Sequence, residues 1–210
     1  MPFGRSSEFA KRCFDLLIAG VGLVLLSPLI VILAVCVVID SPGPALFRQR
    51  RIGRGGTEFV ILKFRTMVVG ADRVGPAITV GRDSRVTRLG RFLRASKLDE
   101  LPQLWNVMKG DMSTVGPRPE VAKYVALYPP GARERVLSVR PGITDQASIA
   151  FAHESDLLDH AADPEQYYAN EILPRKLAMY ESYVAGRSLW GDFRIILATI
   201  ARLYTRRGKR

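Results

Sequence analysis

An uncharged apolar run dominates the first part of the chain. From Leu16 to Ile39 there is no charged residue over 24 positions, and Asp15 and Asp40 bracket the run. As a straight α-helix it would extend about 36 Å, which is enough to cross the hydrocarbon core of a bilayer. Soluble proteins seldom contain such a segment, so the pattern predicts a membrane-embedded region over residues 1–40.

Two features of this run argue against a simple crossing. Ser27-Pro28 divides it in the middle, and a proline there removes an amide donor and clashes with the carbonyl of Val24. Basic residues flank both ends, and the positive-inside tendency draws both ends to the cytoplasmic side. We therefore favour a re-entrant helix-break-helix, with arms of about 18 Å, over a kinked single-pass helix, which a proline also permits. The flanking cations are Arg5, Lys11, Arg12, Arg48, Arg50, Arg51 and Arg54.

The remaining residues, 41–210, have the pattern of one α+β, helix-dominated catalytic domain. Short strands are expected over residues 45–51 and 57–64, paired as a small β-hairpin. Apolar residues at helical spacing predict helices over residues 98–108, 164–186 and 189–204, and residues 75–81 have loop composition. With no second boundary in sight, residues 1–40 and 41–210 form one functional unit, the second part cytosolic and membrane-associated.

The expected helix over residues 189–204 has two interpretations. Its apolar side can pack in the core, or it can lie in the membrane interface as an amphipathic helix with Trp190 as an anchor. The apolar side consists of Leu189, Phe193, Ile196, Leu197, Ile200 and Leu203.

Composition and charge narrow the class of protein. The chain has 210 residues, 48% of them hydrophobic and 24% charged, with a net charge of +11. This composition excludes wholesale disorder and a polytopic membrane protein. Only two cysteines are present, Cys13 and Cys36, so no disulfide framework exists, as expected of a protein facing a reducing cytoplasm.

Cations recur at every third position over residues 82–97. Because this spacing drifts around a helix, not all of them can converge on one ligand. They can lie beside anionic lipid headgroups, or two or three of them can bind phosphates, and we expect both. The cations are Arg82, Arg85, Arg88, Arg91, Arg94 and Lys97.

Asp99-Glu100 is the candidate acid cluster. Pro102 suits the first turn of a helix, so Asp99 could simply be its N-cap. Among so many cations, however, two adjacent carboxylates are what metal-assisted phosphoryl transfer requires. One could attack phosphorus or hold Mg²⁺, and the other could handle a proton.

Several cations are candidate phosphate ligands. Two prolines fix the backbone around Arg118, which presents its guanidinium with little conformational freedom. The alternative is a rigid turn in which Arg118 pairs with a structural carboxylate such as Asp111. Lys63 and Arg65 lie on one face of an expected strand, and Arg140 precedes a Pro-Gly turn.

These residues resemble the monotopic phosphoglycosyl transferases, bacterial sugar transferases that start glycoconjugates on undecaprenyl phosphate. The resemblance covers residues 11 to about 145. The matching segments, in family order, are Lys11-Arg12 with Phe14-Asp15, Ser27-Pro28, Ser41-Pro42-Gly43-Pro44, Phe47-Arg48-Gln49, Lys63-Phe64-Arg65-Thr66-Met67, Leu98-Asp99-Glu100-Leu101-Pro102-Gln103-Leu104, Gly110-Asp111-Met112-Ser113, Val115-Gly116-Pro117-Arg118-Pro119 and Arg140-Pro141-Gly142-Ile143-Thr144.

The resemblance implies a mechanism and its partners. Asp99 would attack the β-phosphorus of a nucleotide sugar, most simply a UDP sugar, release the nucleoside monophosphate and hold the phosphosugar covalently. Glu100 would assist transfer to undecaprenyl phosphate, and Mg²⁺ would sit at Asp99. The phosphate-binding positions would be Lys63, Arg65, Arg94, Arg118 and Arg140. The location implied is the cytoplasmic face of the bacterial inner membrane, in exopolysaccharide or other glycoconjugate synthesis.

After Thr144 the sequence departs from the pattern of the family. The resemblance therefore does not indicate which sugar is transferred. A competing hypothesis is a non-enzymatic, membrane-anchored basic protein that binds anionic lipid or nucleic acid. We expect no nucleic-acid partner, because the aromatic residues do not alternate with the cations as stacking platforms would. The sequence leaves a homodimer open.

Overall fold

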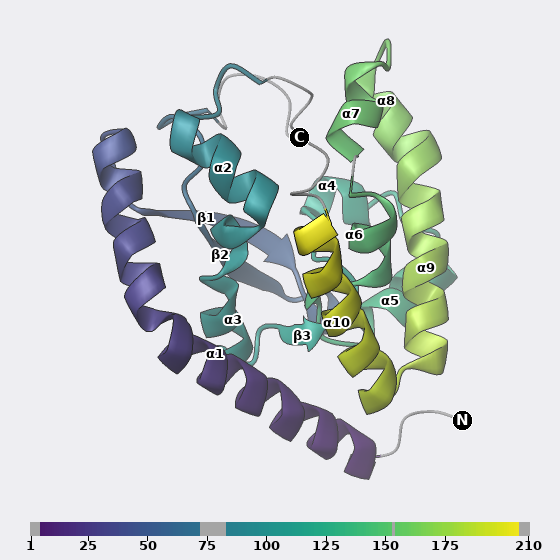
Figure 1. Cartoon of the computed structure of the whole chain (residues 1–210). Helices are drawn as coiled ribbons and strands as arrows, with labels where there is room; N and C mark the ends of the chain where they lie inside the picture. The colour runs from purple at the N-terminus through teal and green to yellow at the C-terminus, as the bar shows by residue number, and fades with distance from the viewer. Residues whose placement is uncertain (1–4, 72–82, 153, 206–210) are drawn as a thin grey trace.

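The computed structural model describes residues 5–71, 83–152 and 154–205. The predicted loop over residues 75–81 and Arg82 lie outside these ranges. Helices dominate the described residues, and the strands form two small sheets (Figure 1). The predicted helix-dominated α+β class is therefore confirmed.

The first half of the chain carries the long helix and the hairpin. Its elements are α1 (Arg5–Asp40), β1 (Leu46–Ile52), the 3₁₀ turn η1 (Arg54–Gly56), β2 (Glu58–Phe64), α2 (Arg88–Ser96), the 3₁₀ turn η2 (Leu98–Glu100), α3 (Gln103–Lys109) and β3 (Ser113–Val115). β1 and β2 pair antiparallel, as the sequence predicted.

The second half is almost entirely helical. Its elements are α4 (Ala122–Val125), α5 (Pro130–Leu137), β4 (Gly142–Thr144), α6 (Gln146–Ala150), α7 (Glu154–Asp159), α8 (Pro164–Tyr167), the π-turn η3 (Tyr168–Ile172), α9 (Leu173–Gly186) and α10 (Leu189–Thr205). β4 pairs in parallel with β3. The segment that departs from the family pattern thus folds as α6 and α7.

Two predicted helices have different internal structure from that expected. The helix over residues 98–108 begins later, because Pro102 is the N-cap of α3 and only the short turn η2 precedes it. The helix over residues 164–186 contains a π-turn at Tyr168–Ile172. That turn ends two residues before Pro174, which lacks the amide proton that a regular helix would use.

α1 is helical throughout and bends about midway (Figure 1). Pro28 cannot donate to the carbonyl of Val24, and the hydroxyl of Ser27 donates to that carbonyl instead, at 2.8 Å. The bend therefore lies in a helix whose freed acceptor is satisfied by the neighbouring side chain. The sequence predicted two helices separated by a break, whereas the structure has one continuous helix with a kink.

Both halves of α1 pack on the same domain. In the N-terminal half the buried residues Lys11, Asp15 and Ala19 recur at every fourth position, and in the C-terminal half Leu33 and Val37 do so. Ala19 packs with the core of β2 and α3, whereas Leu33 and Val37 pack with Phe64 and Leu93. The rest of α1 is largely apolar and exposed: in its most apolar stretch of 18 residues, only 11% of the residues are buried.

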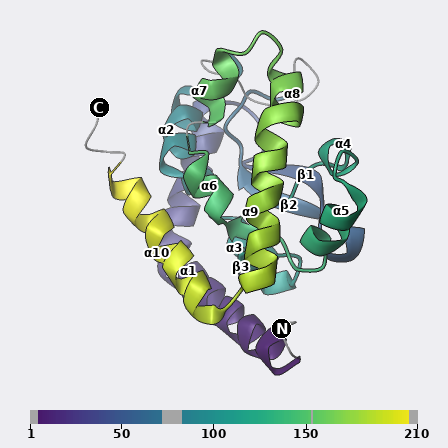
Figure 2. The same cartoon turned by 90° about the vertical axis from the view of Figure 1, so that its right-hand side faces the viewer.

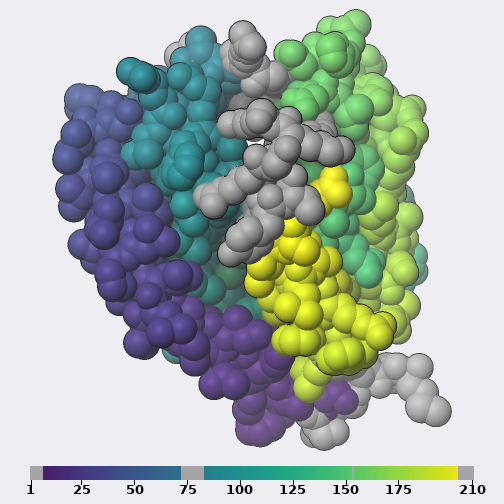
Figure 3. Space-filling view, viewed as in Figure 1, coloured from purple at the N-terminus to yellow at the C-terminus, as the bar shows by residue number. Residues whose placement is uncertain are grey.

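A second exposed apolar face belongs to α10. Trp190, Phe193, Leu197 and Ile200 are each at least 40% exposed, while Asp192 and Ile195 face the protein. Trp190 stacks on Phe193 with ring centroids 5.6 Å apart. α10 lies beside the N-terminal half of α1, and the two helices adjoin on one face of the molecule (Figures 2 and 3). The interpretation that this side packs in the core is wrong for Phe193, Leu197 and Ile200.

The attachment of both halves of α1 to one domain makes a prediction about topology. We expect single cysteines at positions 5 and 54, in a chain with Cys13 and Cys36 changed to serine, to react with an impermeant thiol reagent from the same side of the membrane. A helix that crossed the bilayer would separate its ends by the whole hydrocarbon core of about 30 Å. Labelling of the two positions from opposite sides would contradict the prediction.

Candidate active site

Glu100 lies at the centre of the candidate site. It belongs to the turn η2, and its carboxylate is buried against the end of β2. The ammonium of Lys63, the last residue but one of β2, donates to Glu100 Oε1 at 2.9 Å. Arg118 donates to the same oxygen at 2.5 Å and reaches Oε2 at 3.5 Å. Two cations from distant parts of the chain therefore converge on one carboxylate.

Burial and charge shift the pKa values of this cluster in different directions. Burial acts to raise the pKa of Glu100, but the charges of Arg118 and Lys63 outweigh it and hold the pKa well below its usual range. Burial lowers the pKa of Lys63 to about 8, although Glu100 opposes the change. Glu100 is therefore firmly ionised, and Lys63 loses its charge in the mildly alkaline range.

Asp99 is buried beside this cluster with a free acceptor. Its exposed fraction is 7%, and its Oδ1 has no hydrogen-bond partner in the described structure. Burial, followed by the charge of Glu100, raises the pKa of the Asp99 carboxyl, and Lys63 is foremost among the cations that oppose this rise. The alternative that Asp99 is the N-cap of this helix is wrong, because Asp99 lies in η2 and the N-cap position of α3 is Pro102. Leaving a buried carboxylate oxygen unpaired is costly, so this atom is available to a ligand.

α2 brings Arg94 to the same site. The hydroxyl of Thr87 caps the helix by accepting a hydrogen bond from Gly90 N at 2.9 Å. Gly90 lies so close to the backbone of Thr66 that a Cβ atom would clash, so glycine permits the contact between α2 and the residues following β2. Arg94 Nε then donates to Thr66 Oγ1 at 2.8 Å, and the Arg94 charge acts on Asp99.

A left-handed residue turns the chain from α2 into η2. Lys97 has φ 58° and ψ 14°, and its amide bonds back to the last turn of α2. Such a conformation costs a non-glycine residue about 1 kcal/mol. The turn places Asp99 and Glu100 in the interior immediately after an exposed helix end.

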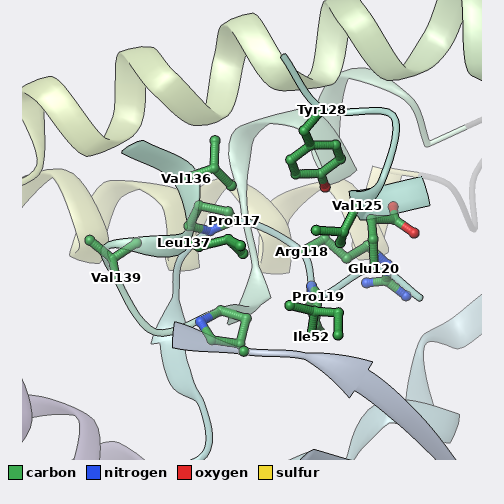
Figure 4. A pocket seen from close by; sticks show the side chains of 12 residues that line it. Ile52, Pro117, Arg118, Pro119, Glu120, Val125, Tyr128, Val136, Leu137 and Val139 are labelled. Atoms are coloured by element: carbon green, nitrogen blue, oxygen red, sulfur yellow. The ribbon is translucent and has the colours of Figure 1, made fainter. Parts of the chain in front are cut away.

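The loop that carries Arg118 is held at both ends. Gly116 N donates to Thr144 O at 3.1 Å, and Gly142 N donates to Pro117 O at 3.0 Å. On the other side, Arg51 donates to Pro119 O at 3.1 Å. A small pocket beside the loop is lined largely by apolar side chains, and neither Asp99 nor Glu100 lines it (Figure 4). Arg118 and Glu120 line this pocket together with apolar side chains, so it adjoins the loop without including Asp99 or Glu100.

Asp111 does not pair with Arg118. Its carboxylate lies 3.0 Å from Lys109 Nζ and accepts a hydrogen bond from Asn106. The alternative of a structural Arg118–Asp111 pair is wrong, and Arg118 pairs with Glu100 instead.

The structure does not bring Arg65 to the carboxylates. Its guanidinium is buried and donates to the carbonyls of Pro42, Ser41 and Val37, at 2.7, 2.5 and 3.3 Å. Gly43, with φ +126°, passes so close that any side chain there would meet this guanidinium. Arg65 holds the end of α1 and the following turn, so the structure places it apart from the carboxylates.

Arg140 is likewise placed elsewhere. Its Nε donates to Gly110 O at 2.9 Å, at the end of α3, where Arg12 donates to the carbonyls of Val107 and Met108. The two arginines complete the last turn of α3, and Arg140 is not part of the cluster around Glu100. The residues that the structure does bring together are Lys63, Arg94, Asp99, Glu100 and Arg118.

Sequence reasoning missed the support behind Arg118. Glu120 is buried, accepts a 2.6 Å hydrogen bond from the Tyr168 hydroxyl and lies 3.6 Å from Arg51. The only signal in the sequence is a carboxylate directly after the Pro-Arg-Pro motif. The role of Arg51 depends on the pairing of β1 with a loop far along the chain.

Comparison with known proteins assigns the chain that forms this site to a family. Residues 6–206 match the model of the family described as "Bacterial sugar transferase". The chain belongs to the bacterial sugar transferase family. This confirms the resemblance in the sequence, and the transferase is therefore an enzyme. Nothing in the comparisons supports the non-enzymatic alternative.

Individual relatives are similar over most of the chain. A "UDP-glucose:undecaprenyl-phosphate glucose-1-phosphate transferase" of Caulobacter vibrioides is 38% identical over 94% of this chain and 71% of its own length. A "UDP-N-acetylgalactosamine-undecaprenyl-phosphate N-acetylgalactosaminephosphotransferase" of Aeromonas hydrophila is 37% identical over 96% of this chain. The transferase spans only 45% of that second relative.

The pKa of Lys63 gives the site a predicted pH dependence. We expect the affinity for UDP, measured by calorimetry, to fall as the pH rises through about 8, because Lys63 then loses the charge that attracts a diphosphate. In Lys63→Arg the decline should move to higher pH, since a guanidinium stays charged.

Lys123→Arg is the matched control, because Lys123 is exposed and pairs with Glu165 outside the cluster. It should titrate like the wild type. An affinity of the wild type that is constant between pH 7 and 10 would contradict the prediction.

Proposed function

We propose that the transferase moves a sugar 1-phosphate from a UDP sugar to undecaprenyl phosphate through a covalent intermediate on Asp99. The observation that carries the proposal is the unpaired, buried Oδ1 of Asp99 beside a carboxylate that two cations hold. The names of the relatives, which specify UDP sugars and undecaprenyl phosphate, support this substrate class. The relatives differ in their sugar, so the proposal leaves the sugar open.

In the first half-reaction Asp99 is the nucleophile. A carboxylate oxygen of Asp99 forms a bond to the β-phosphorus, the bond from that phosphorus to the bridging oxygen breaks, and UMP leaves with the electron pair. The raised pKa of Asp99 reflects a carboxylate that is poorly solvated and correspondingly reactive. Lys63, Arg94 and Arg118 balance the charge on the phosphates.

In the second half-reaction an oxygen of undecaprenyl phosphate attacks the same phosphorus. The bond between phosphorus and Asp99 breaks, and the carboxylate is regenerated. A proton on the acceptor phosphate passes to Glu100. Because Lys63 and Arg118 hold the pKa of Glu100 well below its usual range, this transfer requires both cations to turn from Glu100 toward the substrate phosphates.

Asp99 is also the residue that would hold Mg²⁺. Its unpaired oxygen fits a cation that proteins bind through one or two carboxylates, with substrate phosphates and water completing the shell. Among the described residues no group of three or more His, Cys, Asp and Glu side chains could hold a metal, so the donor would supply ligands. When bound, Mg²⁺ neutralises diphosphate charge.

The exposed apolar faces of α1 and α10 suit a membrane-bound enzyme. The two helices adjoin (Figure 3), and the acyl chains of lipid would cover their exposed apolar side chains. Since both halves of α1 attach to one domain, we place α1 in the membrane as a re-entrant helix. The basic flanks support a position of the domain on the cytoplasmic face, where the nucleotide sugar is available.

Replacement of the nucleophile tests the function directly. We expect Asp99→Asn to lower UMP release from UDP sugars by at least about 10³-fold, as loss of a covalent nucleophile does. Its thermal stability should stay the same or rise, because a buried unpaired carboxylate is costly. Asp159→Asn, in an exposed carboxylate of α7, is the matched control and should keep full activity.

The covalent step has its own measurement. Wild-type protein mixed with donor in the absence of undecaprenyl phosphate should carry a phosphosugar on the peptide that contains Asp99, detected by mass spectrometry. Substantial UMP release by Asp99→Asn, or an adduct on another residue, would refute the assignment.

The Mg²⁺ proposal predicts a ligand-dependent stabilisation. UDP with Mg²⁺ should raise the melting temperature of the wild type more than UDP with EDTA does, because binding to the native state stabilises it. In Asp99→Asn the added effect of Mg²⁺ should disappear. An equal Mg²⁺ effect in both proteins would place the metal elsewhere.

A further inference from the structure

A buried polar network joins α1 to β3, α9 and α10. Lys11 Nζ lies 2.8 Å from Asp15 Oδ1 and 2.9 Å from Asp192 Oδ2, and none of the three side chains is more than 9% exposed. One cation therefore serves two buried carboxylates from opposite ends of the chain. Such an arrangement is costly to desolvate, and its hydrogen bonds must be satisfied for it to persist.

The carboxylate of Asp15 binds the first two residues of β3 through hydrogen bonds. Its Oδ1 accepts hydrogen bonds from Thr114 N at 3.0 Å, Thr114 Oγ1 at 2.5 Å and Ser113 Oγ at 3.1 Å. Because one of these donors is a backbone amide, the contact fixes the strand itself. The residue that fixes it belongs to the long apolar helix.

The Tyr183 hydroxyl reaches the end of the same strand, and Asp192 contacts that hydroxyl. The Tyr183 hydroxyl lies 2.9 Å from Asp192 Oδ1 and 3.0 Å from Val115 O. Burial raises the pKa of Asp192, and the charge of Lys11 opposes the rise. The hydroxyl has one proton, which it donates either to Val115 O or to Asp192 Oδ1, and the first of these hydrogen bonds ties the last residue of β3 to α9.

The strand held in this way leads directly into the Arg118 loop. Val115 is followed by Gly116, Pro117 and Arg118, and the two prolines that flank Arg118 leave this connection little freedom to absorb a shift of the strand. Arg118 must reach Glu100 with its guanidinium, and hydrogen bonds of this kind depend steeply on position. A displacement of β3 would therefore reach the phosphate site.

We propose that Asp15, Tyr183 and Asp192 are positioning residues that hold β3 and thereby place the Arg118 guanidinium. The proposal rests on the proposed function in one respect, since it takes Arg118 to bind donor phosphate. It makes the seating of α1 on the domain a condition for donor binding.

Tyr183→Phe is the sharpest test, because it removes only the hydroxyl that contacts Val115 and Asp192. We expect kcat/KM for the UDP sugar to fall about 5- to 10-fold, as for loss of one useful hydrogen bond. Tyr124→Phe is the matched control: it removes the hydroxyl of another buried tyrosine, one that has no hydrogen-bond partner in the described structure. Tyr124→Phe should act like the wild type.

A double-mutant cycle separates positioning from general destabilisation. If the network acts through Arg118, Tyr183→Phe should have less than about a 2-fold effect in an Arg118→Lys background. If Tyr183→Phe lowered kcat/KM by the same factor in the Arg118→Lys background as in the wild type, the network would act independently of Arg118. That result would overturn the proposal. Asp15→Asn should behave in the same way, provided that its far-ultraviolet circular dichroism matches that of the wild type.

Hydrogen exchange tests the positioning without any activity. In Tyr183→Phe the amides of residues 113–118 should exchange faster than in the wild type, while those of residues 46–64 should not change. Unchanged exchange at 113–118 would overturn the proposal. If the wild type released no UMP, the proposed function would fail, and the exchange experiment would still decide whether the network holds β3.

Discussion

The buried carboxylate of Glu100 is the interaction on which the site depends. It accepts hydrogen bonds from Lys63 on β2 and from Arg118 in the loop after β3, so it joins segments that are otherwise separate. A buried ion pair is a poor way to stabilise a protein, since desolvation offsets much of the attraction. Its value here is geometric, because it brings Lys63 and Arg118 together at the residue next to Asp99, whose carboxyl the charge of Lys63 also reaches.

The neighbouring carboxylates have opposite environments. Glu100 is surrounded by donors, whereas Asp99 Oδ1 has none in the described structure. Adjacent residues of one short turn thereby acquire pKa shifts of opposite sign, which is how a site separates two carboxylates into two roles. The left-handed Lys97 and the close contact at Gly90 are the local features that make this turn possible.

The helix α1 contributes more than an apolar surface. Its N-terminal half supplies Asp15 to β3, and its C-terminal end is held by Arg65. Because these contacts lie on either side of the bend, the shape of α1 is coupled to the position of the domain that it anchors. The apolar faces of α1 and α10 can meet lipid only in the orientation that these buried contacts fix.

The sequence by itself determined the local features. An uncharged run, a proline in its middle, two alternating strands and the Asp99-Glu100 pair are read from neighbouring residues. Their spacing suffices to predict the long apolar helix and the hairpin, and to make Asp99-Glu100 the candidate for the chemistry, whereas the continuity of the helix through Pro28 needed the structure. The partners of each charged group needed the tertiary structure. Arg118 pairs with Glu100 rather than Asp111, Arg65 binds the end of α1 and the turn after it, and Asp15 binds β3. These contacts join residues 18 to 99 positions apart, and packing of whole elements, which local spacing does not encode, decides them.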